Sequence, residues 1–194
     1  MAYKAKKPLE RELYKPVKEY LEARFKESLT HCYLEITSEG KFSQELKRLI
    51  PHDIIFSFLG KQASPDLVGF TWTTDNLWLF LLPIARSGVK DFITVEIKRE
   101  PITLKDVYQA KMYGDLFRAK YALLISPEPI PEEIKRLHRR VFVLYRVTDW
   151  KVYIGSWNES TNAVESWFPE APFGSWPLRT WLAPWTPPDK DKKP

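Results

Sequence analysis

Short apolar runs alternate with stretches of helical spacing in this chain, and that alternation limits the folds open to it. The runs "FITVEIK" and "YALLIS" have the length and the β-branched character of buried strands. Between them, "ITLKDVYQAKMYGDLF" has apolar residues three and four apart, and Thr103 and Asp106 are placed to cap its start. A helix between two buried strands predicts an α/β fold, with a mixed central β-sheet flanked by α-helices.

The same periodicities predict the remaining elements. Expected helices cover 8–28, 43–50 and 131–140, and expected strands cover 32–37, 65–72 and 141–147. Residues 53–60 fit either a strand or a buried helix, and 77–84 form one more apolar run. Pro16 must lie in the first turn of its helix or mark a kink, because an interior proline removes a backbone hydrogen bond.

The composition changes near residue 150, and this change predicts the domain organisation. Residues 1–150 are expected to form one domain. Residues 151–186 are rich in tryptophan and proline and are expected to pack their rings onto that domain, although they could also form a stacking or partner surface. Residues 187–194, "PPDKDKKP", predict a disordered tail.

Several classes of protein are excluded by what the chain contains. It has 194 residues, and it has no uninterrupted apolar stretch long enough to span a bilayer. A single cysteine, Cys32, cannot form an internal disulfide, and with three histidines it cannot complete a Cys/His zinc cage. The first residues lack the apolar segment of a secretory signal, so a cytoplasmic location is expected. Cys32 lies in an apolar run and is expected to be a packed thiol.

Basic residues are in modest excess. The formal net charge is +5, and basic residues recur in "YKAKKP", "KREPITLK", "FRAKY" and "IKRLHRR", which fall in loops or at helix ends. A solvated surface would explain this distribution. It is also compatible with a polyanionic partner such as nucleic acid.

The strand at 91–98 places charge where a buried strand is normally apolar. Side chains alternate between the two faces of a strand, so Ile93, Val95 and Ile97 share one face. Glu96 and Lys98 share the other face. Burying a charged side chain without a partner costs free energy, so Glu96 and Lys98 are expected to contact each other, solvent or a metal ion. A simple ion pair is one sufficient explanation.

Two further groups of polar residues accompany this pair. Asp66 follows a proline at the start of an expected strand about thirty residues upstream. Gln109 and Tyr113 lie four apart, on one face of the next expected helix. The order P-D, then E-x-K on a strand, then Q-x-x-x-Y on a helix resembles the PD-(D/E)xK nuclease superfamily, in its branch with a RecB-type helix motif. The resemblance covers roughly residues 8–147 and implies a restriction-endonuclease-like core.

The resemblance implies a magnesium-dependent site. Asp66, Glu96 and the backbone carbonyl of Ile97 would hold Mg²⁺, for which Mn²⁺ could substitute, because these cations prefer oxygen ligands. Lys98 would lie beside the attacking water, orienting it or helping to deprotonate it, and would stabilise charge on the phosphate. Gln109 and Tyr113 would hold the lysine or a phosphate. Their structural alternative is a surface glutamine and a core tyrosine.

Two choices of acidic residue remain open in the sequence. The family often has a glutamate on its first helix; Glu10 is chosen over Glu12 because Glu10 shares a face with the apolar residues of that helix. Asp53 also follows a proline closely, but Asp66 is preferred because its proline is adjacent and an apolar strand follows. The long interval between Asp66 and Glu96 leaves open an inserted strand or a misplaced aspartate.

The function expected from these residues is that of a Mg²⁺-dependent deoxyribonuclease, hydrolysing phosphodiester bonds in endo- or exonuclease mode. Its partner would be nucleic acid, with DNA favoured over RNA, and not a membrane. Target choice could come from DNA structure, from a homodimer or from a separate protein partner. The alternative is an inactive nuclease-fold module that binds or assembles through its Trp-rich segment. A third possibility is a plain structural domain with a surface Glu96–Lys98 pair.

Overall fold

The fold is taken from a computed structural model that describes residues 9–27, 31–50, 64–72, 91–146 and 150–173. Six strands form one mixed sheet in the order β1-β2-β3-β4-β5-β6. They are β1 (His31–Ile36), β2 (Leu67–Trp72), β3 (Asp91–Ile97), β4 (Ala119–Ser126), β5 (Val152–Asn158) and β6 (Ala163–Phe168). The pairs β3–β4 and β4–β5 are parallel, and the other three pairs are antiparallel. The expected α/β fold with a mixed sheet is confirmed.

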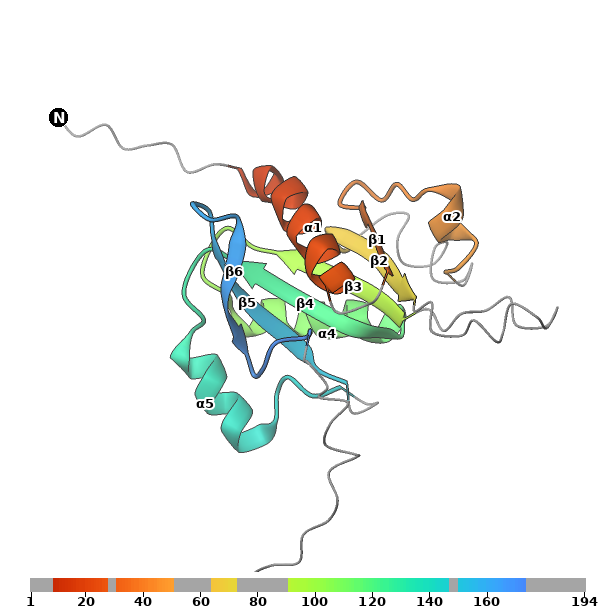
Figure 1. The fold of residues 1–194 in the computed structure, drawn as a ribbon. Helices are drawn as coiled ribbons and strands as arrows, with labels where there is room; N and C mark the ends of the chain where they lie inside the picture. The colour runs from red at the N-terminus through yellow and green to blue at the C-terminus, as the bar shows by residue number, and fades with distance from the viewer. Residues whose placement is uncertain (1–8, 28–30, 51–63, 73–90, 147–149, 174–194) are drawn as a thin grey trace, which may run out of the picture.

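Helices flank this sheet (Figure 1). They are α1 (Glu10–Glu27), α2 (Gln44–Lys47), α4 (Leu104–Leu116) and α5 (Glu132–Val141). Helix α4 connects the parallel strands β3 and β4, and α5 follows β4, as parallel neighbours require crossover connections. Thr103 and Asp106 form the expected capping box at the start of α4. None of the described helices is both long and apolar enough to cross a membrane.

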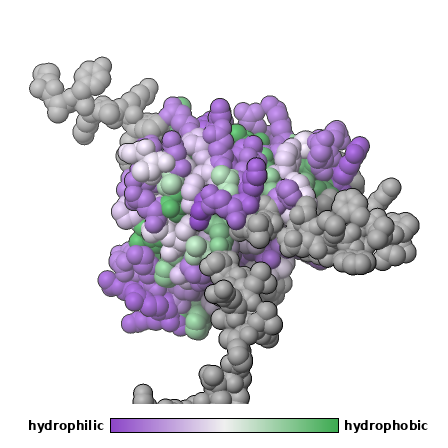
Figure 2. All heavy atoms as spheres, viewed as in Figure 1, coloured by the Kyte–Doolittle hydropathy of each residue, from purple (hydrophilic) through white to green (hydrophobic). Residues whose placement is uncertain are grey.

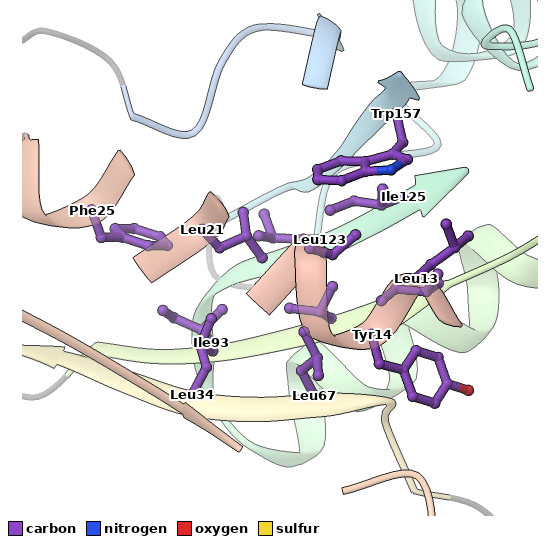
Figure 3. Packing of buried hydrophobic residues seen from close by; sticks show 13 residues of the cluster. Leu13, Tyr14, Leu21, Phe25, Leu34, Leu67, Ile93, Leu123, Ile125 and Trp157 are labelled. Carbon is purple, nitrogen blue, oxygen red and sulfur yellow. The ribbon is translucent and has the colours of Figure 1, made fainter. Parts of the chain in front are cut away.

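Each face of the sheet has its own hydrophobic core. On one face, Leu13, Val17, Leu21 and Phe25 of α1 pack on the side chains of β2, β3 and β4 (Figure 3). Their spacing of four, four and four places all of them on one side of the helix. On the opposite face, α4 and α5 cover Ala122, Leu124, Val152 and Ile154. Central strands covered on both faces read as continuous apolar runs, which explains their sequences.

Three expectations about secondary structure change. Of the expected strand at 141–147, the structure describes 141–146, and these residues form the end of α5 followed by a turn and an isolated bridge between Tyr145 and Lys151. Pro131 is the N-cap of α5 and not its first helical residue. Pro16 lies inside α1, beyond its first turn, so the first of its two expected placements is wrong. The backbone N–H of Phe142 still donates to the His138 carbonyl of α5. This apolar run therefore continues the hydrogen bonding of the helix and does not begin a strand.

The segment that follows residue 150 contributes two strands to the central sheet. Residues 152–168, which composition placed in an extension, form β5 and β6 of the central sheet. Trp157 is 2% exposed and packs against Tyr20 of α1, with ring centroids 5.6 Å apart. The expectations for 53–60, 77–84 and 187–194 lie outside the described residues, as does the question of Asp53.

Candidate active site

The register of β2 and β3 brings the motif acids together. Leu67 pairs with Val95 in antiparallel register, so Asp66, one residue before β2, continues that register opposite Glu96. The backbone N–H of Ile97 donates to Asp66 Oδ2 at 2.7 Å. Two residues thirty positions apart in sequence therefore lie side by side at the carboxyl end of β3. The side chain of Ile97 is buried in the α1 core, so only its backbone could contribute to a site.

Asp66 is held by two donors. Besides the Ile97 N–H, the hydroxyl of Tyr14 donates to Asp66 Oδ1 at 2.7 Å. Asp66 is 7% exposed. Burial raises its pKa from the ordinary value, although both hydrogen bonds oppose the shift and the nearby charge of Glu10 adds to it. The carboxylate is fixed in place by these two donors, and its burial disfavours the charged form.

Glu96 has one satisfied oxygen and one unsatisfied oxygen. Its Oε1 accepts from Lys98 Nζ at 2.7 Å and from Gln109 Nε2 at 2.8 Å. Its Oε2 is buried and has no hydrogen-bond partner in the part of the chain that the structure describes. Burial, and then the charge of Asp66, raise the pKa of Glu96 to about 7. A buried carboxylate oxygen without a donor is costly, so this atom marks a place for a ligand.

Lys98 supplies positive charge to the cluster. Its side chain is 23% exposed, and its ammonium group contacts Glu96. Burial would lower the pKa of Lys98. The hydrogen bond and charge of Glu96, with smaller contributions from Glu10 and Asp66, outweigh burial and raise it. Lys98 therefore stays protonated near neutral pH.

Helix α4 positions Gln109 and Tyr113 beneath the strand end. The Gln109 amide donates to Glu96, and its nitrogen lies 3.5 Å from the Tyr113 hydroxyl oxygen. Tyr113 is 2% exposed, and burial raises its pKa. The family resemblance implied that Gln109 holds the lysine or a phosphate. In the structure Gln109 donates to Glu96 instead. Gln109 and Lys98 together occupy Oε1 and leave Oε2 open.

The first helix reaches the site through Glu10 and Tyr14. The Tyr14 hydroxyl lies 3.1 Å from Glu10 Oε1, in addition to its shorter contact with Asp66. Figure 3 shows this hydroxyl pointing away from the hydrophobic cluster that holds the ring. Glu10 is half-buried, whereas Glu12 is exposed, so the structure places Glu10 nearer to the cluster. Sequence reasoning missed Tyr14, although its position one helical turn after Glu10 was a usable signal.

The donor set fits a hard divalent cation by its chemistry. Asp66 and Glu96 are adjacent carboxylates with raised pKa values, and Glu96 Oε2 is a buried oxygen with no donor. Within the described residues, no group of three or more His, Cys, Asp and Glu side chains could hold a metal ion. A cation here would therefore need a backbone carbonyl and water in addition to two carboxylates, which is typical of Mg²⁺.

Comparison with known proteins found no matching family model, no matching curated protein and no matching solved structure.

Proposed function

We propose that this protein is a metal-dependent nuclease that hydrolyses phosphodiester bonds in DNA. The observation that carries the proposal is Glu96. This buried carboxylate has one oxygen held by Lys98 and Gln109, a second oxygen without a donor, and Asp66 beside it. A structural ion pair would have no need for the second acid or for the open oxygen.

Each residue has a role that its contacts support. Asp66, Glu96 and the Ile97 carbonyl would hold Mg²⁺, which when bound supplies charge stabilisation to the phosphate and activates water. Lys98 would orient the attacking water and stabilise negative charge on the phosphate, since its side chain is partly exposed and its ammonium group contacts Glu96. Gln109 and Tyr14 act as positioning residues, because each donates to one of the two acids.

The order of elements agrees with the resemblance to the PD-(D/E)xK superfamily. An acid-bearing helix leads, the P-D aspartate begins one strand, E-x-K ends the next, and the helix with Gln109 and Tyr113 is followed by a parallel strand. This order supports a restriction-endonuclease-like core. The net charge of +5 supports a polyanionic substrate, and binding of such a substrate should weaken as salt rises.

The test is cleavage of supercoiled, linear, single-stranded and branched DNA, with Mg²⁺, Mn²⁺ or chelator. Wild type is compared with Glu96→Gln and Lys98→Met, and with Glu12→Gln as a matched control on an exposed carboxylate. We expect metal-dependent cutting that is lost in the first two variants and kept in the control. Calorimetry should show a metal site in wild type that Glu96→Gln lacks. Absence of both cutting and metal binding in wild type would favour the alternative of an inactive binding or assembly module.

A further inference from the structure

Four aromatic side chains gather at the carboxyl end of α5. The His138 ring is stacked on Tyr145, with centroids 5.7 Å apart and an interplanar angle of 12°. It also meets Phe142 and Phe168 edge to face, at 6.1 and 5.4 Å. His138 is buried beneath them, whereas Phe142 is 61% and Tyr145 is 37% exposed. The buried ring thus supports two rings that face solvent.

Phe142 has an unusual backbone for its side chain. It is the C-cap of α5 and adopts the left-handed conformation, with φ 52° and ψ 41°. Glycine is the common residue there, because a bulky side chain at positive φ is strained. The ring does not recover this cost by burial, since most of it is exposed. An exposed phenylalanine at a position that favours glycine suggests a function for the ring.

Basic side chains lie beside these rings. The acidic residues of α5 are in its first turn, and Arg139 and Arg140 are in its last turn, which ends at the C-cap Phe142. Arg139 is 3.9 Å from Glu132, an exposed pair of little strength, and Lys151 over the Tyr145 ring contacts Glu170. Figure 2 shows mainly hydrophilic residues over α5 on the face in view. The rings therefore lie beside a hydrophilic helix whose last turn is basic.

A lysine connects this surface to the helix of the candidate active site. Lys111 Nζ donates to the Val143 carbonyl at 3.0 Å and lies 5.6 Å from the centroid of the Tyr108 ring. Tyr108 is 55% exposed and directly precedes Gln109, which holds Glu96. We call the surface formed by Tyr108, Lys111, Arg139, Arg140, Phe142 and Tyr145 the aromatic track.

The aromatic track and Glu96 also lie on the same side of the sheet. Glu96 pairs with Leu124, Leu124 with Ile154, and Ile154 with Phe168, which contacts His138. Directly paired residues point to the same face, so Glu96 and Phe168 lie on one side of the sheet, three strand spacings or about 14 Å apart. The shorter link from the track to the acids is α4, which carries both Tyr108 and Gln109.

We propose that the aromatic track binds single-stranded nucleic acid, stacking bases on Phe142, Tyr145 and Tyr108 and placing phosphates near Arg139, Arg140 and Lys111. This rests on the proposed function and assigns its substrate a single-stranded segment. Exposed rings interspersed with basic side chains are how proteins bind single strands without reading their sequence. A duplex keeps its bases stacked on each other, so these rings would gain nothing from it.

The test is binding of a short fluorescent oligodeoxythymidylate, followed by anisotropy in the Glu96→Gln background with chelator, so that no cutting occurs. Phe142→Ala and Tyr145→Ala should each weaken binding at least about five-fold, the lower range for loss of one stacked base. Phe142→Trp should keep binding because it keeps a ring. Lys26→Ala, on α1 at the opposite face, is the control for loss of an exposed cation. A duplex of matched length should show no dependence on Phe142.

The outcomes separate this proposal from others. Equal binding by wild type, Phe142→Ala and Tyr145→Ala would overturn it. Full binding by Phe142→Leu would also overturn it, because leucine keeps an apolar contact but has no ring on which a base can stack. Phe142→Gly should be at least as stable as wild type in thermal unfolding, because glycine adopts positive φ without strain. Weaker binding by this variant would then not be due to unfolding. If binding depends on the rings but the protein with Glu96 intact cleaves no DNA, the nuclease proposal is refuted and the aromatic track stands. Cleavage without ring dependence would refute the track alone.

Discussion

The substitution Glu96→Gln, studied without metal, tests the electrostatics of the candidate site most directly. Glu96 is 4% exposed, and burial followed by the charge of Asp66 raises its pKa from 4.5 to about 7. Each pH unit between these values corresponds to about 1.4 kcal/mol of free energy. The full interval of 2.5 units therefore corresponds to at most about 3 kcal/mol of unfolding free energy.

The sign follows from which state binds the proton more tightly. Because the folded pKa is above the unfolded one, the contribution of Glu96 to stability is fully present below about pH 4.5. It is lost as pH rises through about 7, where the buried group must ionise. Glutamine has nearly the same shape and does not ionise. The unfolding free energy of Glu96→Gln relative to wild type should thus rise by about 3 kcal/mol between pH 4.5 and pH 8.

The assay is urea unfolding with chelator at a series of pH values, followed by tryptophan fluorescence. Glu12→Gln is the control, since Glu12 is exposed and should follow wild type at every pH. Adding Mg²⁺ at pH 8 to about 100 times its dissociation constant should stabilise wild type by about 2.7 kcal/mol and leave Glu96→Gln unchanged. Parallel pH curves for Glu96→Gln and wild type would refute the reasoning, because they would mean that Glu96 is solvated.

Three other substitutions or reactions test separate parts of the structure. Tyr14→Phe removes a donor from buried Asp66 and should cost about 1–3 kcal/mol of unfolding free energy at neutral pH, measured by urea unfolding; no loss would mean that the hydroxyl is not bonded. Gly69→Ala should prevent normal pairing of β1 and β2, because a Cβ there would lie 1.9 Å from the Tyr33 carbonyl oxygen. Thermal unfolding followed by circular dichroism measures the effect, and a folded variant as stable as wild type would contradict it. Cys32 is half-buried, and burial raises the pKa of its thiol to about 12. Iodoacetamide at pH 8 should therefore alkylate the native protein more slowly than the urea-unfolded one, and equal rates would contradict the raised pKa.

Sequence patterns over a few residues predicted the features that depend only on near neighbours in the chain. Period-two alternation placed Glu96 and Lys98 on one face of β3, and their contact follows from that placement. The capping box at Thr103 depends on residues three apart and could be read directly. Glu10 was chosen over Glu12 by helical phase, and the structure shows the same difference in exposure.

Features that depend on distant packing could not be read in this way. The hydrogen bond between Tyr14 and Asp66 joins residues 52 apart and exists only because α1 lies across the sheet. Strands β5 and β6 were missed for a different reason: their aromatic residues suggested an extension by composition. Aromatic residues are also strand formers, and β5 contributes side chains to the cores on both faces of the sheet, so its sequence lacks the simple alternation of apolar and polar residues.

Helix α4 links the two proposed activities of this protein. Tyr108 and Gln109 are adjacent, so their side chains leave the helix about 100° apart. Tyr108 faces solvent beside Lys111, and Gln109 turns inward to Glu96. A shift of α4 on stacking at Tyr108 would also move the amide that holds Glu96 Oε1, because the two residues are adjacent on one helix. Binding of a strand on the track and binding of a cation at the acids should therefore affect each other. By thermodynamic linkage, metal should change the oligonucleotide affinity by the same factor as the oligonucleotide changes the metal affinity.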